Sequence, residues 1–294
     1  MEFVIYLALV LVGACLGSFA GASVWRLRAR QLARDKKNHE PVSGREFNRL
    51  EKLAHTKLSK DRSRCLHCDH TLKWYELLPV ISWLAQRGKC RSCHKPIGYF
   101  EILIELGMIA FFVISYAFWP FNLYDAGNPL EVVRFILWLL AGVVMAMLFS
   151  YDAKWYLLPD KLTIALAGIG IATLTVASIQ SGNPLESILS GLGAVAILSG
   201  LYLVLFLISK GRWVGFGDVK LGFGLALLLI DWQLALVALF LANLIGCLVV
   251  IPGLMSGKLK RSSHVPFGPL LILGAIAAQF IGPAILSFYV GTLI

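Results

Sequence analysis

Acidic side chains are rare in the long apolar runs of this 294-residue chain, so the few that occur there stand out. Four of them are candidates for chemistry: Glu105, Asp152, Asp160 and Asp218. An ionisable group at membrane depth is costly, and it is therefore a candidate for a functional role. Asp152 ends one apolar run and Asp218 opens another, and both are expected at a similar depth on the same side of the membrane.

Two carboxylates from different helices at one depth are the geometry that an aspartyl protease requires. Like charges a few ångströms apart cannot both ionise cheaply, so such a pair shares one proton. The ionised member takes a proton from water, and the protonated member polarises the scissile carbonyl. Gly215 and Gly217 precede Asp218 and let a substrate backbone approach closely. We therefore predict that Asp152 and Asp218 form the catalytic pair of a protease.

Each of the four acids also fits a simpler role. Asp152 and Asp218, taken singly, fit solvated helix ends. Asp160 follows a proline and is expected to cap the amino end of the next helix. Glu105 is either a partner for cytoplasmic basic residues or a polar element of a second active site, and the sequence does not separate the two.

Four of the six cysteines form two Cys-x-x-Cys pairs, Cys65 with Cys68 and Cys90 with Cys93, with 21 residues between the pairs. This spacing is close to the zinc-ribbon pattern. Each pair turns tightly enough to aim two thiolates at one ion, and two pairs complete a tetrahedral site. We predict a structural zinc ion, which leaves no open coordination position and stabilises the fold without activating water.

The alternatives for these cysteines are two redox dithiols or a pair of disulfides, which a reducing cytoplasm disfavours. His67, His70 and His94 lie beside the pairs as spare ligands, but four thiolates already fill a structural site. Cys15 and Cys247 fall in apolar runs and are expected to serve as packing residues.

The elements that position these residues must be membrane helices. The chain is 58% hydrophobic and 15% charged, with a mean hydropathy of +0.74, whereas a soluble domain is roughly 45–50% apolar and about 25% charged. These figures exclude a soluble globular enzyme, a disordered chain and a secreted disulfide scaffold. We expect an all-α polytopic membrane protein with about eight transmembrane helices and one cytoplasmic zinc-ribbon-like insertion. The candidate spans are 3–24, 102–121, 132–151, 162–180, 187–208, 217–230, 233–254 and 265–292.

The basic residues set the expected orientation. Of the 27 Lys and Arg residues, 18 lie between Arg26 and Lys95, and cytoplasmic loops carry the excess of such residues. Placing segment 26–100 in the cytoplasm leaves Arg134 as the one basic residue outside and predicts an outside amino terminus in the cell (inner) membrane. Segment 217–230, with 14 residues, reaches only about 21 Å of a roughly 30 Å hydrocarbon core and is kept as a short span.

The chain resembles bacterial type IV prepilin leader peptidases, which are polytopic membrane aspartyl proteases with a Gly-x-Gly-Asp signature, here at 215–218. Gly21 and Leu77 stand where the family usually has Asn. Six further stretches carry the likeness in the family's order: 17–27, the two Cys-x-x-Cys pairs, 74–84, 103–106, 152–163 and 266–269.

The resemblance implies a bifunctional enzyme. Family members remove the short basic leader from prepilins and pseudopilins on the cytoplasmic side, after a Gly, and then methylate the new amino terminus, usually of Phe, with S-adenosylmethionine. The family's catalytic aspartates map onto Asp152 and Asp218. The implied organisation is a first transmembrane helix at 1–25, a methyltransferase-associated four-Cys insertion at 26–100 and a protease domain at 101–294. The implied partners are prepilin and pseudopilin precursors and membrane lipid, with no nucleic acid.

Two other classes of protein are weighed against this one. A transporter or channel would relay ions through Glu105, Asp152 and Asp218, but transporters tend to show inverted repeats and charges near the midplane. A membrane-tethered zinc-ribbon binding module would leave the paired acids unexplained.

Overall fold

The computed structural model describes residues 2–55, 62–120, 123, 129–257 and 265–293. The chain divides into two compact units, Met1–Ile114 and Ser115–Ile294. Throughout the described residues the regular elements are helices, with two isolated β-bridges in the first unit.

Seven helices in the described part of the chain are long and apolar enough to cross a membrane, which confirms the prediction of a helical multi-pass protein. The eighth expected span, at 217–230, is a helix of only 14 residues, α9 (Phe216–Leu229). The seven long helices are α1 (Glu2–Lys37), α4 (Phe100–Ala117), α5 (Pro129–Trp155), α6 (Asp160–Gln180), the continuous helix Pro184–Ser209, α10 (Trp232–Met255) and α11 (Phe267–Leu293). The continuous helix Pro184–Ser209 consists of α7 (Pro184–Val195), a π-helical turn η3 (Ala196–Gly200) and α8 (Leu201–Ser209).

In the first unit, α1 continues well beyond the expected span and α2 (Gly44–His55) folds back against it. The contact is an apolar cluster in which Phe47, Leu50 and Leu53 recur at helical spacing and pack on the last turns of α1. Arg28 donates to both carboxylate oxygens of Glu46 at 3.0 and 2.8 Å. The charged stretch after the first span therefore forms a helical hairpin, α1 with α2, as far as residue 55.

Small residues allow α1 and α4 to approach each other closely. A Cβ atom on Gly17 would lie 2.7 Å from the Cα atom of Glu105, and one on Gly13 would lie 3.0 Å from the carbonyl oxygen of Met108. Two turns further along α1, the Trp25 indole N–H donates to Glu101 Oε1 at 2.9 Å.

The two Cys-x-x-Cys pairs form matching turns between α2 and α4. Each turn closes with one isolated bridge, Arg64 with Thr71 and Lys89 with Pro96. The short helices η2 (Trp74–Leu77) and α3 (Ile81–Ala85) connect the two turns.

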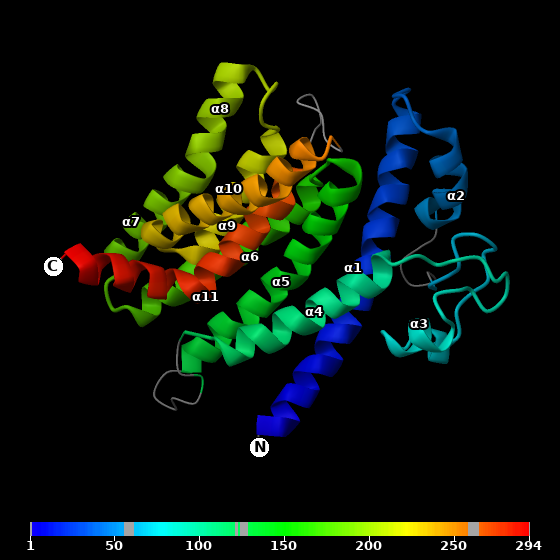
Figure 1. Ribbon diagram of the computed structural model, residues 1–294, viewed down its shortest axis with the longest axis horizontal. Coiled ribbons are helices and arrows are strands. Elements are labelled where there is room, and N and C mark those ends of the chain that lie inside the picture. Colours follow the sequence, from blue (N-terminus) through cyan, green and yellow to red (C-terminus); the bar gives the residue numbers. More distant parts are fainter. Residues whose placement is uncertain (1, 56–61, 121–122, 124–128, 258–264, 294) are drawn as a thin grey trace. The chain divides into compact units, whose positions relative to one another are not determined.

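In the second unit, α9 lies at the centre of the bundle, and Figure 1 shows it between α10 and α6. It contacts α6, α7, η3, α8, α10 and α11, and nearly all of its residues from Val219 onward are buried. A helix enclosed by other helices satisfies its own backbone and does not have to reach across the lipid. This enclosure explains how a 14-residue helix fits a membrane protein.

Two acidic residues, Asp160 and Asp231, lie at the starts of helices in the second unit, and the role expected for one of them is wrong. Asp231 caps α10, because its Oδ1 atom accepts from the Gln233 backbone N–H at 2.7 Å. The expectation that Asp160 caps α6 is wrong: Pro159 is the N-cap residue, and Asp160 is the first residue of the helix. Asp160 instead pairs with Lys220 Nζ of α9 at 2.7 Å, so its carboxylate ties two helices together.

Candidate active site

Asp152 lies near the carboxyl end of α5 and is only 5% exposed. Its Oδ2 atom accepts a hydrogen bond of 3.0 Å from the backbone N–H of Gly268, in the first turn of α11. A Cβ atom at position 268 would fall 2.7 Å from that same oxygen. Glycine at this position is therefore what lets the start of α11 reach the buried carboxyl group.

Asp218 lies in the first turn of α9, and its Oδ2 atom accepts from the Gly215 backbone N–H at 3.2 Å. The partial positive charge of a helix amino terminus favours a carboxylate at this place. Asp152 and Asp218 are close enough to repel each other electrostatically. The two acids that the sequence singled out thus lie close together in the second unit.

Tyr202 of α8 is a neighbour of this pair that the sequence did not reveal. Its side chain is 4% exposed, and the charge of Asp218 and the side chain of Asn243 act on its hydroxyl, which makes no well-formed hydrogen bond among the described residues. Its ring packs against Phe267 with the ring centroids 5.3 Å apart. A buried hydroxyl without a well-formed hydrogen bond is unusual in a folded protein, and this one lies beside Asp218. In the sequence, the only feature that could have pointed to this residue is the presence of a tyrosine within an apolar span.

The other two acids occupy different surroundings. Asp160 is exposed and paired with Lys220. Glu105 belongs to the first unit, where it is 6% exposed and its Oε2 atom accepts from the Val80 backbone N–H at 2.8 Å. Of the four candidate acids, the second unit thus brings Asp152 and Asp218 together as a pair.

The four cysteines converge in the first unit. Their sulfur atoms all lie within 4.8 Å of one another. The Sγ atoms of Cys65 and Cys93 are 3.9 Å apart, and those of Cys68 and Cys90 are 4.0 Å apart. Four sulfurs at about 2.3 Å from one tetrahedral ion lie roughly 3.8 Å apart. The donor set and its spacing fit a tetrahedral metal ion.

The thiols of this cluster differ in their acidity. Burial raises the pKa of Cys65 to about 12. Burial also opposes ionisation of Cys90, but the backbone N–H groups of Cys93 and Ser92 and its cysteine neighbours outweigh it and lower the pKa of Cys90 to about 7. Closely spaced thiolates repel one another, so four of them require a cation among them.

The histidines and the remaining two cysteines stay outside this group. His70 contacts the Glu76 carboxylate at 3.3 Å, and His67 contacts Arg49 at 3.4 Å. Cys15 and Cys247 are exposed, so the expectation that they pack in the interior is wrong. Both lie on helices long enough to span a membrane, where hydrocarbon accommodates a weakly polar thiol.

Comparisons with known proteins agree with this arrangement. Residues 11–119 match the Bacterial Peptidase A24 N-terminal domain, and residues 138–251 match the Type IV leader peptidase family. A Stutzerimonas stutzeri protein named prepilin leader peptidase/N-methyltransferase is 31% identical over 293 residues, covering 96% of this chain and 93% of that protein. A Bacillus subtilis protein of the same name is 29% identical over 237 residues, covering 80% and 88% of the two chains. No solved structure is a significant match. The chain therefore belongs to the type IV prepilin leader peptidase/N-methyltransferase family.

Proposed function

We propose that the chain is a membrane aspartyl endopeptidase that removes the basic leader from type IV prepilins and pseudopilins and then methylates the new amino terminus with S-adenosylmethionine. The observation that carries the proposal is the convergence of Asp152 and Asp218 at the ends of α5 and α9, in a chain that spans 93% of a relative with this name. Both acids belong to the catalytic pair in this proposal.

The two activities are assigned to different parts of the chain. Segment 101–294 contains the protease domain, segment 26–100 is the insertion associated with the methyltransferase, and 1–25 is the first membrane helix. The basic charge of 26–100 supports a cytoplasmic location for that segment and an outside amino terminus. A substrate with a basic leader followed by an apolar helix would then meet acidic groups at the inner face of the membrane.

The proposed cleavage follows from the hydrogen bonds of the pair. Gly268 holds one oxygen of Asp152, and Gly215 holds one oxygen of Asp218, which leaves the second oxygen of each acid for the shared proton. The ionised acid takes a proton from water as the water oxygen bonds to the scissile carbonyl carbon, and the other acid donates its proton to the carbonyl oxygen. The tetrahedral intermediate then returns a proton, the C–N bond breaks, and the leaving amine takes up the proton.

We propose that Cys65, Cys68, Cys90 and Cys93 hold a zinc ion as thiolates. A zinc ion with four protein ligands contributes folding free energy and offers no position for a reacting water. Its proposed role is to hold the turns of the 62–98 segment together.

The test is incubation of the purified full chain in lipid with a synthetic prepilin and isotopically labelled S-adenosylmethionine. Mass spectrometry of the mature product should show a new amino terminus directly after the leader's Gly, carrying one labelled methyl group. An uncleaved precursor would refute the protease, and a cleaved but unlabelled product would refute the methyltransferase.

Gly268→Ala should lower the cleavage rate by about 100-fold, because displacement of a reacting group by about an ångström costs that much. The added Cβ would lie 2.7 Å from Asp152 Oδ2, so either the carboxyl group or the start of α11 must shift. Initial rates on a synthetic prepilin measure the effect. Gly168→Ala is the matched control, because no atom of the described residues beyond its own helix backbone lies within 4 Å of a Cβ at that position. Equal rates for the two variants would contradict the role of Gly268.

Tyr202→Phe should lower kcat by about tenfold or more with little change in KM, because it removes a donor that can act on charge developing at the pair. The phenyl ring retains the packing against Phe267. Tyr289→Phe, at an exposed position, is the control. A wild-type kcat in Tyr202→Phe would show that the hydroxyl takes no part in the reaction.

A further inference from the structure

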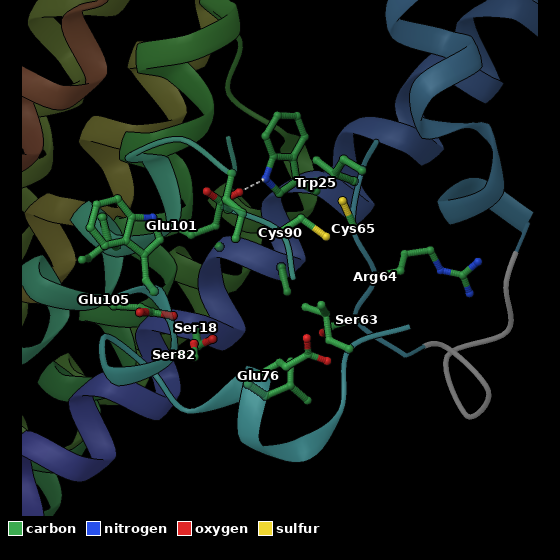
Figure 2. Close-up of a pocket in the computed structure, with 18 of the residues that line it drawn as sticks. Ser18, Trp25, Ser63, Arg64, Cys65, Glu76, Ser82, Cys90, Glu101 and Glu105 are labelled. Carbon is green, nitrogen blue, oxygen red and sulfur yellow. Dashed lines mark hydrogen bonds between the residues drawn. The ribbon is translucent and has the colours of Figure 1, made fainter. Parts of the chain in front are cut away.

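The first unit contains a cavity of about 180 Å³ that the proposed protease chemistry does not use. It lies among α1, α2, the cysteine turns and the beginning of α4, and two zinc-site cysteines, Cys65 and Cys90, form part of its wall (Figure 2). Three glutamates line it: Glu76, Glu101 and Glu105. A concentration of carboxyl groups around one cavity is unexpected in a segment that is otherwise strongly basic.

Glu101 carries an unused hydrogen-bond acceptor in this cavity. Its Oε1 atom accepts from the Trp25 indole N–H at 2.9 Å, as the dashed line in Figure 2 shows. Its Oε2 atom is buried and has no hydrogen-bond partner among the residues that the structure describes. A buried, unpaired carboxylate oxygen is costly, and a ligand that donates a hydrogen bond or carries positive charge would remove that cost.

The two other glutamates add negative charge and are fixed in place. Glu105 is 6% exposed and is held by the Val80 N–H at 2.8 Å. Glu76, also 6% exposed, accepts from the Lys73 N–H at 2.8 Å through Oε2. Because their orientation is set by backbone donors, these carboxylates form a preorganised negative wall.

The cavity also offers indole rings and three arginines, Arg26, Arg49 and Arg64. Trp25 and Trp83 both line it, and indole faces attract cations as well as planar rings. The guanidinium of Arg49, on α2, lines the same cavity and lies 5.9 Å from the Trp25 ring centroid. The site therefore suits a small molecule with cationic groups, a carboxylate and an aromatic ring.

We propose that this cavity binds S-adenosylmethionine, whose sulfonium and ammonium groups face Glu101 and Glu105 and whose carboxylate faces Arg49. The inference rests on the proposed methyltransferase function, and it assigns that function a site within the first unit. The free amino terminus of a cleaved pilin is a weaker fit, because it brings one cation and no carboxylate or aromatic heterocycle beside it.

Isothermal titration of S-adenosylmethionine into the purified, metal-loaded full chain tests the proposal without any prepilin present. The wild-type chain should bind one equivalent. Glu101→Gln should weaken binding about tenfold or more, because it removes the charge of the unpaired oxygen. The glutamine side chain keeps an acceptor for Trp25, so the fold is retained. Leader cleavage by the same sample should stay at the wild-type rate, which separates this site from the protease.

Two further variants and their controls sharpen the result. Trp25→Phe should also weaken binding, because it removes both the donor to Glu101 and the indole face. Glu51→Gln and Trp74→Phe, at exposed positions outside the cavity, should bind like the wild type. Unchanged affinity in Glu101→Gln would overturn the proposal, as would binding that requires a cleaved pilin. Loss of cleavage in the wild-type sample would instead refute the proposed protease function.

Discussion

Asp152→Asn and Asp218→Asn should each reduce leader cleavage by at least about 10³-fold, since either change removes a group that transfers protons in the transition state. An amide cannot take a proton from water, and it cannot donate the single shared proton that the pair requires. The replacement has nearly the same shape, and an Asn oxygen at position 152 still accepts from the Gly268 N–H, so the fold should be retained. Initial rates on a synthetic prepilin measure the effect.

The matched control is Asp160→Asn, which removes an acid from the segment that follows α5. Asp160 is exposed and paired with Lys220, and it makes no contact with Asp152 among the interactions of the described residues. Its variant should cleave within a few-fold of the wild-type rate, because exposed ion pairs contribute little. A normal rate in either Asp152→Asn or Asp218→Asn would show that the two acids do not act as a pair.

The nearness of Asp152 to Asp218 could be predicted because it depends on simple features of the sequence. Each acid marks an end of an apolar run, and counting membrane crossings places both ends on one side. That reasoning fixes the depth of a residue in the bilayer but not which helices are neighbours. The sequence does not show that α11 contacts both α5, which carries Asp152, and α9, which carries Asp218.

The residues that complete the site were less accessible to sequence reasoning. Gly268 reaches Asp152 through its backbone N–H, and the sequence marks 266–269 as part of the family likeness without showing that this glycine meets Asp152. Tyr202 is one aromatic residue among several in its apolar run, and only its burial beside Asp218, which the sequence does not show, sets it apart. Asp160 was misassigned because a local cap and a distant partner, Lys220, compete for the same side chain.

In the first unit as well, some features could be predicted from the sequence and others could not. The cysteine spacing predicted the four-sulfur cluster, since the ligands of one ion must converge whatever the chain does between them. The cavity next to it joins Trp25 of α1 to Glu101 of α4, and the sequence gives no sign that these residues meet. The close approach of the two helices depends on Gly17, where a side chain would collide with the backbone of Glu105.

The double variant Cys65→Ser, Cys68→Ser should lose its metal, falling from about one zinc ion per chain to none, because two ligands cannot hold a structural ion. Structural zinc contributes roughly 10–16 kcal/mol of apparent binding free energy in small domains, so the 62–98 segment should become sensitive to protease digestion. Elemental analysis and limited proteolysis of the purified chain measure both effects. The control is Cys15→Ser, Cys247→Ser, which removes two exposed thiols from the apolar helices and should keep the metal. Full metal content in the first double variant would refute a zinc site built from these four cysteines, since the cluster has no fifth ligand among the described residues.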